Sequence, residues 1–223
     1  MNDMSVSEAV ASRRSVRGFL DKAVPLETLR RVMDKARMAP SGCNFQPWEA
    51  TIVSGEPLKA LQQRMLAASP QDPMEYDYNA PSQSPVHLAR VQELGGTMYE
   101  TMGIARTDKD ARDAFMEANV LSFGAPALLL CYFPRFMKEA QWSDVGMWLQ
   151  TIMLLLREEG LDSCPQEYMG LYARLIKDFL GVSDETHIFF CGIAIGWRDA
   201  SLPVNNFERP RVPLDQQVQF LGF

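Results

Sequence analysis

The fold of this chain is decided by one stretch in its second half, SDVGMWLQTIMLLLREE, which occupies residues 143–159. From Val145 to Leu156 the stretch is apolar on almost every side of a helix, and Gly160 is where such a helix ends. Ser143 or Asp144 is the expected N-cap. A helix that is apolar all round is buried, in a core or between subunits. For a chain of 223 residues we expect a subunit interface.

Shorter helices and strands are predicted before and after this helix in the sequence. Apolar runs of strand length predict strands at 49–54, 125–132 and 187–196. A capping box at Ser5 and Glu8 begins a first helix that ends near Arg13. Further helices are expected from Pro25 to Pro40 and over 57–67, 86–102, 107–123 and 171–180. Short strands separated by helices predict the α+β class, with one small sheet flanked by helices in a single domain over 1–223.

Composition excludes several classes of protein. Lys and Arg total 22 and Asp and Glu total 28, so the net charge of −6 argues against nucleic-acid binding. No run approaches the roughly 20 apolar residues of a membrane span, and the first residues have no secretory pattern. The four cysteines lie far apart, which predicts no zinc site and no disulfide framework. We therefore expect a cytoplasmic protein that needs neither membrane nor metal.

Two segments depart from regular structure. Residues 69–85 are rich in proline and acidic side chains, and together with the stretch up to residue 106 they form a candidate lid. A plain surface loop is the alternative. From residue 205 to 223 two prolines predict an extended arm whose apolar end docks on another surface.

Arginines gather near both ends of the chain. Arg13, Arg14 and Arg17 stand with Ser15 at the end of the first helix, and Arg209 and Arg211 lie on the extended arm. Arginine binds phosphate in a planar, bidentate manner, so both groups are candidate anion-binding residues. Ordinary surface charge is the alternative for each group taken alone.

Two loops could contact a ligand. The stretch APSGCNFQPW, residues 39–48, combines two backbone-fixing prolines, a glycine and polar side chains that can read the edge of a flat heterocycle. The stretch GLDSCPQE, residues 160–167, is a proline-containing loop whose backbone N–H groups can face a ligand. Each has a purely structural alternative, a tight turn between elements.

Taken together, these segments resemble the nitroreductase family of FMN-dependent oxidoreductases. The motifs RRSxR, PSxxNxQPW, GLDSxPQE and RxRxP occur in the order of the family, and the stretch GIAIGW at 192–197 resembles its late strand. The resemblance covers nearly the whole chain. It implies a three-layer α/β/α fold around a mostly antiparallel sheet, in an intertwined homodimer whose two FMN sites are built by both subunits.

The resemblance also implies roles for individual residues. FMN-contacting positions are Arg13, Arg14, Ser15, Arg17, Pro40, Ser41, Gly42, Asn44, Pro165, Gln166, Glu167, Gly196, Arg209 and Arg211. Arg13, Ser15, Arg209 and Arg211 should hold the phosphate. Gly196 should lie on the ribityl–phosphate side. Arg17 should lie near the N1/O2 edge of the flavin, where reduction places negative charge. The backbone N–H of Glu167 should face N5, and the residues from Pro40 to Asn44 should come from the partner subunit.

The implied activity is a ping-pong oxidoreductase reaction. NADH or NADPH gives a hydride to the flavin, and a nitroaromatic acceptor is then reduced to nitroso and hydroxylamine products. Neither a catalytic side chain nor a metal is required. Three alternatives stay open: the same chemistry on quinones, enones or halogenated aromatics, a flavin-binding storage protein without turnover, and a dimeric scaffold without flavin. His87 and His187 are expected to be structural, and Cys164 to be a small buried residue.

Overall fold

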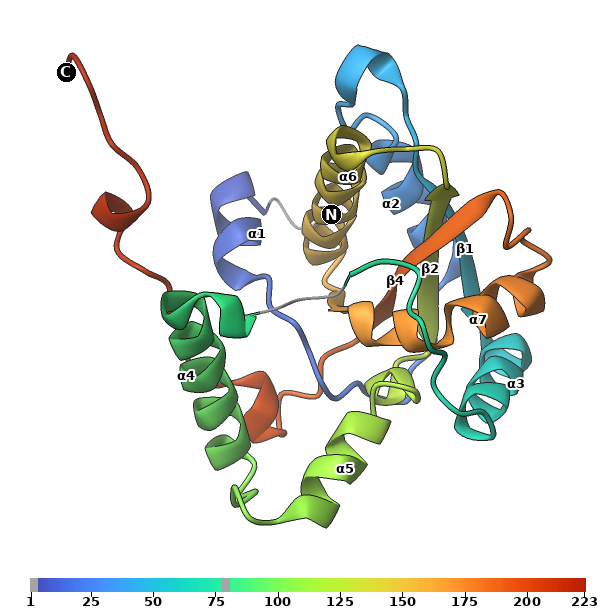
Figure 1. Ribbon diagram of the computed structural model, residues 1–223, viewed down its shortest axis with the longest axis horizontal. Coiled ribbons are helices and arrows are strands. Elements are labelled where there is room, and N and C mark those ends of the chain that lie inside the picture. The colour runs from blue at the N-terminus through green and yellow to red at the C-terminus, as the bar shows by residue number, and fades with distance from the viewer. Residues whose placement is uncertain (1–3, 78–80) are drawn as a thin grey trace.

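One antiparallel sheet forms the middle of the protein, as seen in the computed structural model, which describes residues 4–77 and 81–223 (Figure 1). Its strands lie in the order β1-β2-β4-β3. Their bounds are β1 (Glu49–Ser54), β2 (Ala127–Pro134), β3 (Asp162–Gln166) and β4 (His187–Gly196). The strands predicted at 49–54 and 187–196 are confirmed, and the third begins and ends two residues later than predicted.

Helices cover both faces of this sheet, which makes three layers (Figure 1). The helices are α2 (Leu26–Ala36) and α6 (Glu139–Glu158) on one face, and α3 (Gly55–Leu66) and α7 (Ala173–Leu180) on the other. Side chains alternate along a strand, so Leu129 of β2 packs toward α6 while Leu128 and Leu130 pack toward α3 and α7. The predicted α+β class and α/β/α layering are confirmed.

The central helix α6 differs from its prediction in two ways. It begins at Glu139 after the N-cap Lys138, so neither Ser143 nor Asp144 is its cap. The residues before Ser143, EAQW, belong to its first turn, where apolar residues alternate with polar ones and do not extend the helical pattern. The helix is also not buried all round in this chain: Val145 is fully buried, whereas Met147 on the opposite face is 40% exposed.

Three helices lie outside the layers. They are α1 (Val6–Ser12), α4 (Pro85–Thr101) and α5 (Lys109–Glu117). The predicted capping box of α1 is present, with the Ser5 hydroxyl accepting from Glu8 N and the Glu8 carboxylate accepting from Ser5 N. The helix predicted at 107–123 is too long, because the chain turns after α5 through Ser122 and Phe123, both at a φ of 53°.

Two predictions near β3 are wrong. The segment 160–167 was expected as a loop, yet residues Asp162–Gln166 form β3, which pairs with β4. Pro165 is tolerated because β3 lies at an edge of the sheet, where a missing N–H costs no ladder bond. The helix predicted at 171–180 begins instead at Ala173, after the 3-10 segment η4 (Glu167–Tyr172).

The first part of the candidate lid is tied down by a buried ion pair. The side chains of Glu75 and Lys177 are 5% and 0% exposed, and they contact each other directly. The other Glu75 oxygen accepts from the backbone N–H of Phe189 at 2.8 Å. Tyr76 donates its hydroxyl to the carbonyl of Phe190 at 2.6 Å, where the β2–β4 register shifts. Residues 69–77 therefore close one end of β4, and residues 78–80 lie outside the described part.

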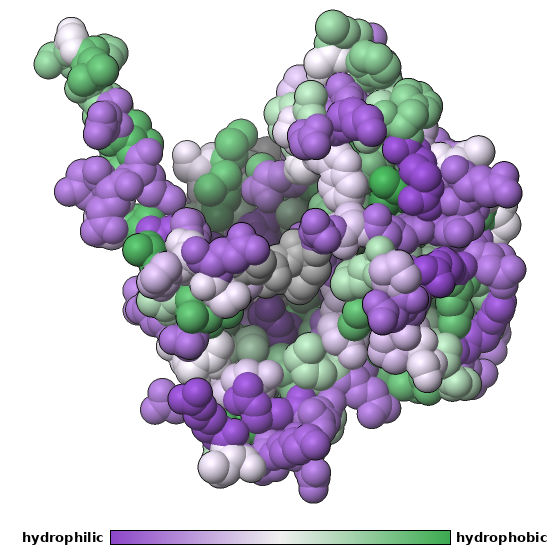
Figure 2. All heavy atoms as spheres, viewed as in Figure 1, coloured by the Kyte–Doolittle hydropathy of each residue, from purple (hydrophilic) through white to green (hydrophobic). Residues whose placement is uncertain are grey.

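The C-terminal tail leaves the body of the protein. After η5 (Pro203–Asn205) it forms a single 3-10 turn, η6 (Leu214–Gln216). Figure 2 shows the tail as a separate projection with hydrophobic side chains at its tip, and Phe220, Leu221 and Phe223 are exposed. Neighbouring exposed apolar side chains of this kind mark a surface that contacts another one.

The ion pair gives a first prediction. Glu75→Gln removes the buried carboxylate and leaves Lys177 with Asp184, whose side chain is 56% exposed, so the free energy of unfolding should fall by about 2 kcal/mol. Urea unfolding measures this loss. The matched control is Asp178→Asn, the next residue on α7, whose pair with Arg64 is exposed and should contribute less than ~1 kcal/mol. Equal effects of the two substitutions would contradict the stabilising role of the buried Glu75–Lys177 pair.

Candidate functional site

The two groups of arginines meet at one pocket. Residues 13–17 after α1 and residues 204–211 of the tail line a cavity of about 90 Å³, together with one side chain of α4. Its lining residues are Arg13, Arg14, Ser15, Arg17, Leu94, Val204, Phe207, Arg209 and Arg211. This volume is enough for a phosphate group.

Asn205 joins the tail to the residues after α1. It is fully buried, and its Oδ1 accepts from the N–H of Arg17 at 2.8 Å. Its Nδ2 donates to the carbonyl of Gly18 at 2.9 Å, and its own carbonyl accepts from the guanidinium of Arg14. Arg209 adds contacts to the carbonyls of Arg13 and Ala11. The sequence analysis missed Asn205, because a single buried amide produces no pattern.

The edge strand β3 forms the other support of the pocket. Ser15 pairs with Ser163 as an isolated parallel bridge, and the N–H of Val16 donates to the carbonyl of Ser163 at 3.0 Å. At the start of β3 the buried carboxylate of Asp162 accepts two bonds from Arg198, at 2.7 and 3.1 Å. These contacts fix the chain after α1 along the sheet, so the guanidiniums project from a rigid base.

The pocket is strongly positive. It is lined by five arginines and by no acidic residue. Burial and then the neighbouring Arg211 lower the pKa of Arg13, and burial and then Arg14 lower the pKa of Arg209. Like charges held this close repel one another, so an anion that enters the pocket relieves the repulsion and accepts several charge-assisted hydrogen bonds.

The residues at the end of β3 lie beside this arginine pocket. Burial raises the pKa of the Cys164 thiol to about 11, with opposing effects from Arg17 and Arg13. The thiol is therefore protonated at neutral pH, as befits a small buried residue. Gln166 is buried and donates its Nε2 to the carbonyl of Asn119 at 2.8 Å. Glu167 is the first residue of η4, so its N–H has no partner within that helical turn.

The loop from Pro40 to Asn44 lies elsewhere in the chain. Gly42 donates its N–H to the Asp144 carboxylate at 3.1 Å, whereas Arg157, farther along α6, contacts Asp162 at 2.9 Å. Thirteen helical residues separate the two contacts, which corresponds to about 20 Å. Within one chain this loop therefore does not reach the arginine pocket.

This loop has an unusual backbone. Cys43, Asn44 and Gln46 have positive φ values of 49°, 58° and 48°. Non-glycine residues in this region carry conformational strain, and such strain is concentrated at ligand-binding and active sites. The loop, including Pro40 and Ser41, remains a predicted ligand-contacting segment. Its ligand would not be the one in the arginine pocket of the same chain.

Gly196 has a packing explanation. A Cβ at this position would lie 2.6 Å from Cδ of Pro126 and 3.0 Å from a ring carbon of Phe19. Gly196 is buried and does not line the arginine pocket. Its expected place beside a ligand stays a prediction.

The remaining polar candidates have structural partners. His187 contacts Glu49 at 3.2 Å, and His87 contacts the Ser84 hydroxyl at 2.6 Å. Within residues 4–77 and 81–223, no group of three or more histidine, cysteine or acidic side chains could hold a metal ion. In the same described residues, no helix combines the length and the apolar character needed to cross a bilayer.

The fold and the pocket together define a class of protein. A three-layer α/β/α domain presents an arginine-lined pocket of phosphate size at an edge of its sheet. Such a pocket suits a ligand that carries a phosphate or a similar anion.

The family follows from comparison with known proteins. The model of the Nitroreductase family matches residues 10–197, and the chain belongs to this family, as its motifs predict. It is 34% identical to a 4-nitrobenzoate reductase of Pseudomonas putida, over 96% of this chain and 94% of that protein.

Solved structures agree with this membership. The chain is similar to the FMN and NADPH-dependent nitroreductase NfnB from Sphigopyxis sp. strain HMH, with 43% identity, a TM-score of 0.93, and 98% and 100% of the two chains covered. It is also similar to NfnB of Mycobacterium smegmatis, solved in complex with NADPH, with 29% identity, a TM-score of 0.90, and 96% and 97% of the chains covered.

The positive pocket gives a second prediction. Inorganic phosphate should raise the melting temperature by about 3–6 °C at a concentration roughly ten times its dissociation constant, because it binds only the folded state. Differential scanning fluorimetry measures the shift. Arg209→Gln should lose most of it, whereas Arg30→Gln, at an exposed position on α2, should keep it. A shift of the same size in all three proteins would mean that phosphate acts through the solvent and not through the pocket.

Proposed function

We propose that this chain is an FMN-dependent oxidoreductase that uses NADH or NADPH to reduce nitroaromatic compounds. The observation that carries the proposal is the pocket in which the arginines of residues 13–17 and 209–211 converge. Membership of the nitroreductase family and the names of the similar proteins support the same assignment.

The residues fit the cofactor at its anionic end. An arginine-lined pocket of phosphate size, without an acidic lining residue, suits the phosphate of FMN and would be destabilising if it stayed without an anion. The chemistry that bound FMN supplies is two-electron transfer between a reduced nicotinamide and an electron-poor acceptor. Arg13, Ser15, Arg209 and Arg211 are the residues proposed to hold the phosphate.

Other residues are proposed to orient and tune the ring. Arg17 is fixed by the bond from its N–H to Asn205 and by a guanidinium contact to the carbonyl of Ser15 at 3.3 Å. A cation held in this way can stabilise negative charge on the pyrimidine side of a flavin. Glu167 offers a backbone N–H to a ring nitrogen. Burial raises the pKa of the Glu167 carboxyl.

The proposed site needs a second copy of this chain. The loop from Pro40 to Asn44 is remote from the arginine pocket in one chain, and the outer face of α6 leaves Met147 partly exposed. Pairing two chains across this face of α6 would cover the apolar surface and bring the loop of one subunit to the pocket of the other. We therefore propose a homodimer with two shared sites, which the exposed apolar tail would also stabilise.

The activity has a direct spectroscopic test. The purified protein, incubated with FMN under argon, should lose its flavin absorbance on addition of NADH or NADPH. The absorbance should return on addition of a nitroaromatic compound. Return with a quinone or an enone alone would favour the alternative acceptors. Absorbance that persists with both nucleotides would favour flavin storage, and failure to bind FMN at all would contradict the proposal.

The dimer has a separate test. Met147→Glu places a charge on the outer face of α6 and should convert a dimer to a monomer, measured by light scattering after gel filtration. The monomer should also bind FMN at least 10-fold more weakly, because loss of two or three hydrogen bonds of about 1 kcal/mol each has this effect. Gln63→Glu, at an exposed position on α3, is the control and should stay dimeric. A monomeric wild-type protein with full FMN affinity would contradict the shared site.

A further inference from the structure

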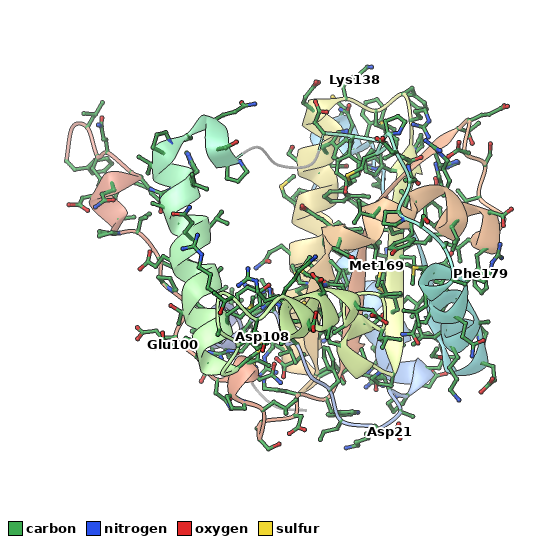
Figure 3. All side chains as sticks on the ribbon, turned by 60° about the horizontal axis from the view of Figure 1, so that its bottom comes forward. Asp21, Glu100, Asp108, Lys138, Met169 and Phe179 are labelled. Atoms are coloured by element: carbon green, nitrogen blue, oxygen red, sulfur yellow. The ribbon has the colours of Figure 1, made fainter. Side chains whose placement is uncertain are left out.

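A second cavity lies between α4 and the beginning of α5. Its volume is about 750 Å³, and it is lined by residues 91–106 of α4 and the following turn, together with Arg112 of α5. Figure 3 shows α4 standing apart from α6, with Glu100 near the end of α4 and Asp108 before α5 on the same side of the molecule. None of the residues that line this cavity belongs to the site described above.

Glycines open the floor of this cavity. Gly95 and Gly96 lie inside α4, where glycine is less favourable than every other residue except proline. A Cβ added at either position would meet no atom within 4 Å, so close packing does not require glycine there. Val91, Gly95 and Tyr99 are spaced four residues apart and share one helix face. The missing side chains therefore leave open space beside the ring of Tyr99.

The cavity also holds cations that have no acidic partner. The guanidinium of Arg112 lies 4.0 Å from the centre of the Tyr99 ring. Among the described residues neither Arg112 nor Arg106 forms an ion pair. Three other partly buried arginines, Arg135, Arg157 and Arg198, each contact a carboxylate, whereas Arg112 resembles the arginines of the pocket described above.

The position of Arg112 suits an anionic ligand. A guanidinium held over the face of an aromatic ring still has N–H donors that match a carboxylate or a phosphate. Glu100 is the acidic residue of the lining and it is exposed to solvent. A half-buried cation over an aromatic ring, next to open space, therefore points to a flat molecule with an anionic substituent.

The cavity adjoins the proposed FMN site. Leu94 of α4 lines the arginine pocket, whereas Val91 and Gly95 on the same helix line the second cavity. One helix is thus the wall between the two spaces. A substrate that reacts at the first site can extend past this wall into the second.

We propose that this second cavity binds the anionic substituent of a substrate, and that Arg112 selects substrates which carry one. The proposal rests on the proposed function. The shared chemistry is an oxyanion that accepts two hydrogen bonds from a guanidinium. Its source is either the carboxylate of an aromatic acceptor or the 2′-phosphate of NADPH.

The test compares substrates with and without the anion. One arm measures kcat/KM for 4-nitrobenzoate against nitrobenzene, and the other measures NADPH against NADH. Arg112→Gln should lower the preference for the anionic member about 10- to 100-fold, the range for a hydrogen bond to a charged group. Arg112→Lys should lower it less, because a lysine keeps the charge and loses the planar geometry. Arg30→Gln, at an exposed position on α2, should change neither preference.

The two arms separate the sources of the anion. A loss confined to the acceptors assigns the carboxylate, and a loss confined to the nucleotides assigns the 2′-phosphate. Gly95→Leu fills the cavity with a better helix former and keeps Arg112, so it should lower the same preference without unfolding α4. Unchanged preferences in both Arg112→Gln and Gly95→Leu would overturn the proposal.

A binding measurement separates this proposal from the proposed function. Benzoate and adenosine 2′-monophosphate are titrated into the protein by calorimetry, which requires no turnover. At least one should bind, and Arg112→Gln should weaken it 10-fold or more. Such binding in a protein without reductase activity would contradict the proposed function alone. Turnover in a protein that binds neither probe, or binds them equally in the variant, would overturn the role of Arg112.

Discussion

Five guanidiniums share one small pocket, and the rest of the site depends on how the protein holds them against their mutual repulsion. Backbone carbonyls hold the guanidiniums in place. Those of Arg13, Ala11 and Asn205 accept hydrogen bonds from two of the guanidiniums, while Asn205 joins the tail to the residues after α1. Because carbonyls orient a cation without neutralising it, the pocket keeps its full positive charge for a ligand. A neighbouring arginine outside the pocket, Arg198, is instead held by the Asp162 carboxylate.

Much of the fold could be predicted from local patterns. β4 is a nearly continuous apolar run and β1, EATIVS, has an apolar centre between polar ends; both were located to the residue. Elements that depend on distant partners were missed. β3 contains Asp162, Ser163 and Pro165, so its strand conformation comes from pairing with β4 and not from its own composition. The first turn of α6, EAQW, alternates polar and apolar residues and does not follow the helical period, so the apolar pattern that predicted this helix began four residues too late.

The site, too, has features that could be predicted from the sequence and features that could not. Arginine clusters at the two ends of the chain are visible in the sequence, and the motifs of the nitroreductase family indicated that they meet. The buried residues that arrange them, Asn205 and Asp162, left no signal, because one amide and one carboxylate in a polar stretch resemble surface residues. The second cavity was hidden for another reason. Two adjacent glycines on α4 weaken its helical pattern. The sequence also does not show that Arg112, which follows the turn after α4, lies beside the open space.

Residues 69–77 close the end of β4, and this limits how copies of the protein can associate through their sheets. Beyond the last residue of β3, β4 would present unpaired N–H and C=O groups at an open edge, which is a template for adding a strand from another molecule. The Glu75 carboxylate and the Tyr76 hydroxyl occupy the N–H of Phe189 and the carbonyl of Phe190 instead. Side chains satisfy these groups without offering a new edge, so the sheet cannot grow there. The closed edge thereby protects the protein from joining other copies through its strands, the route that leads to aggregates.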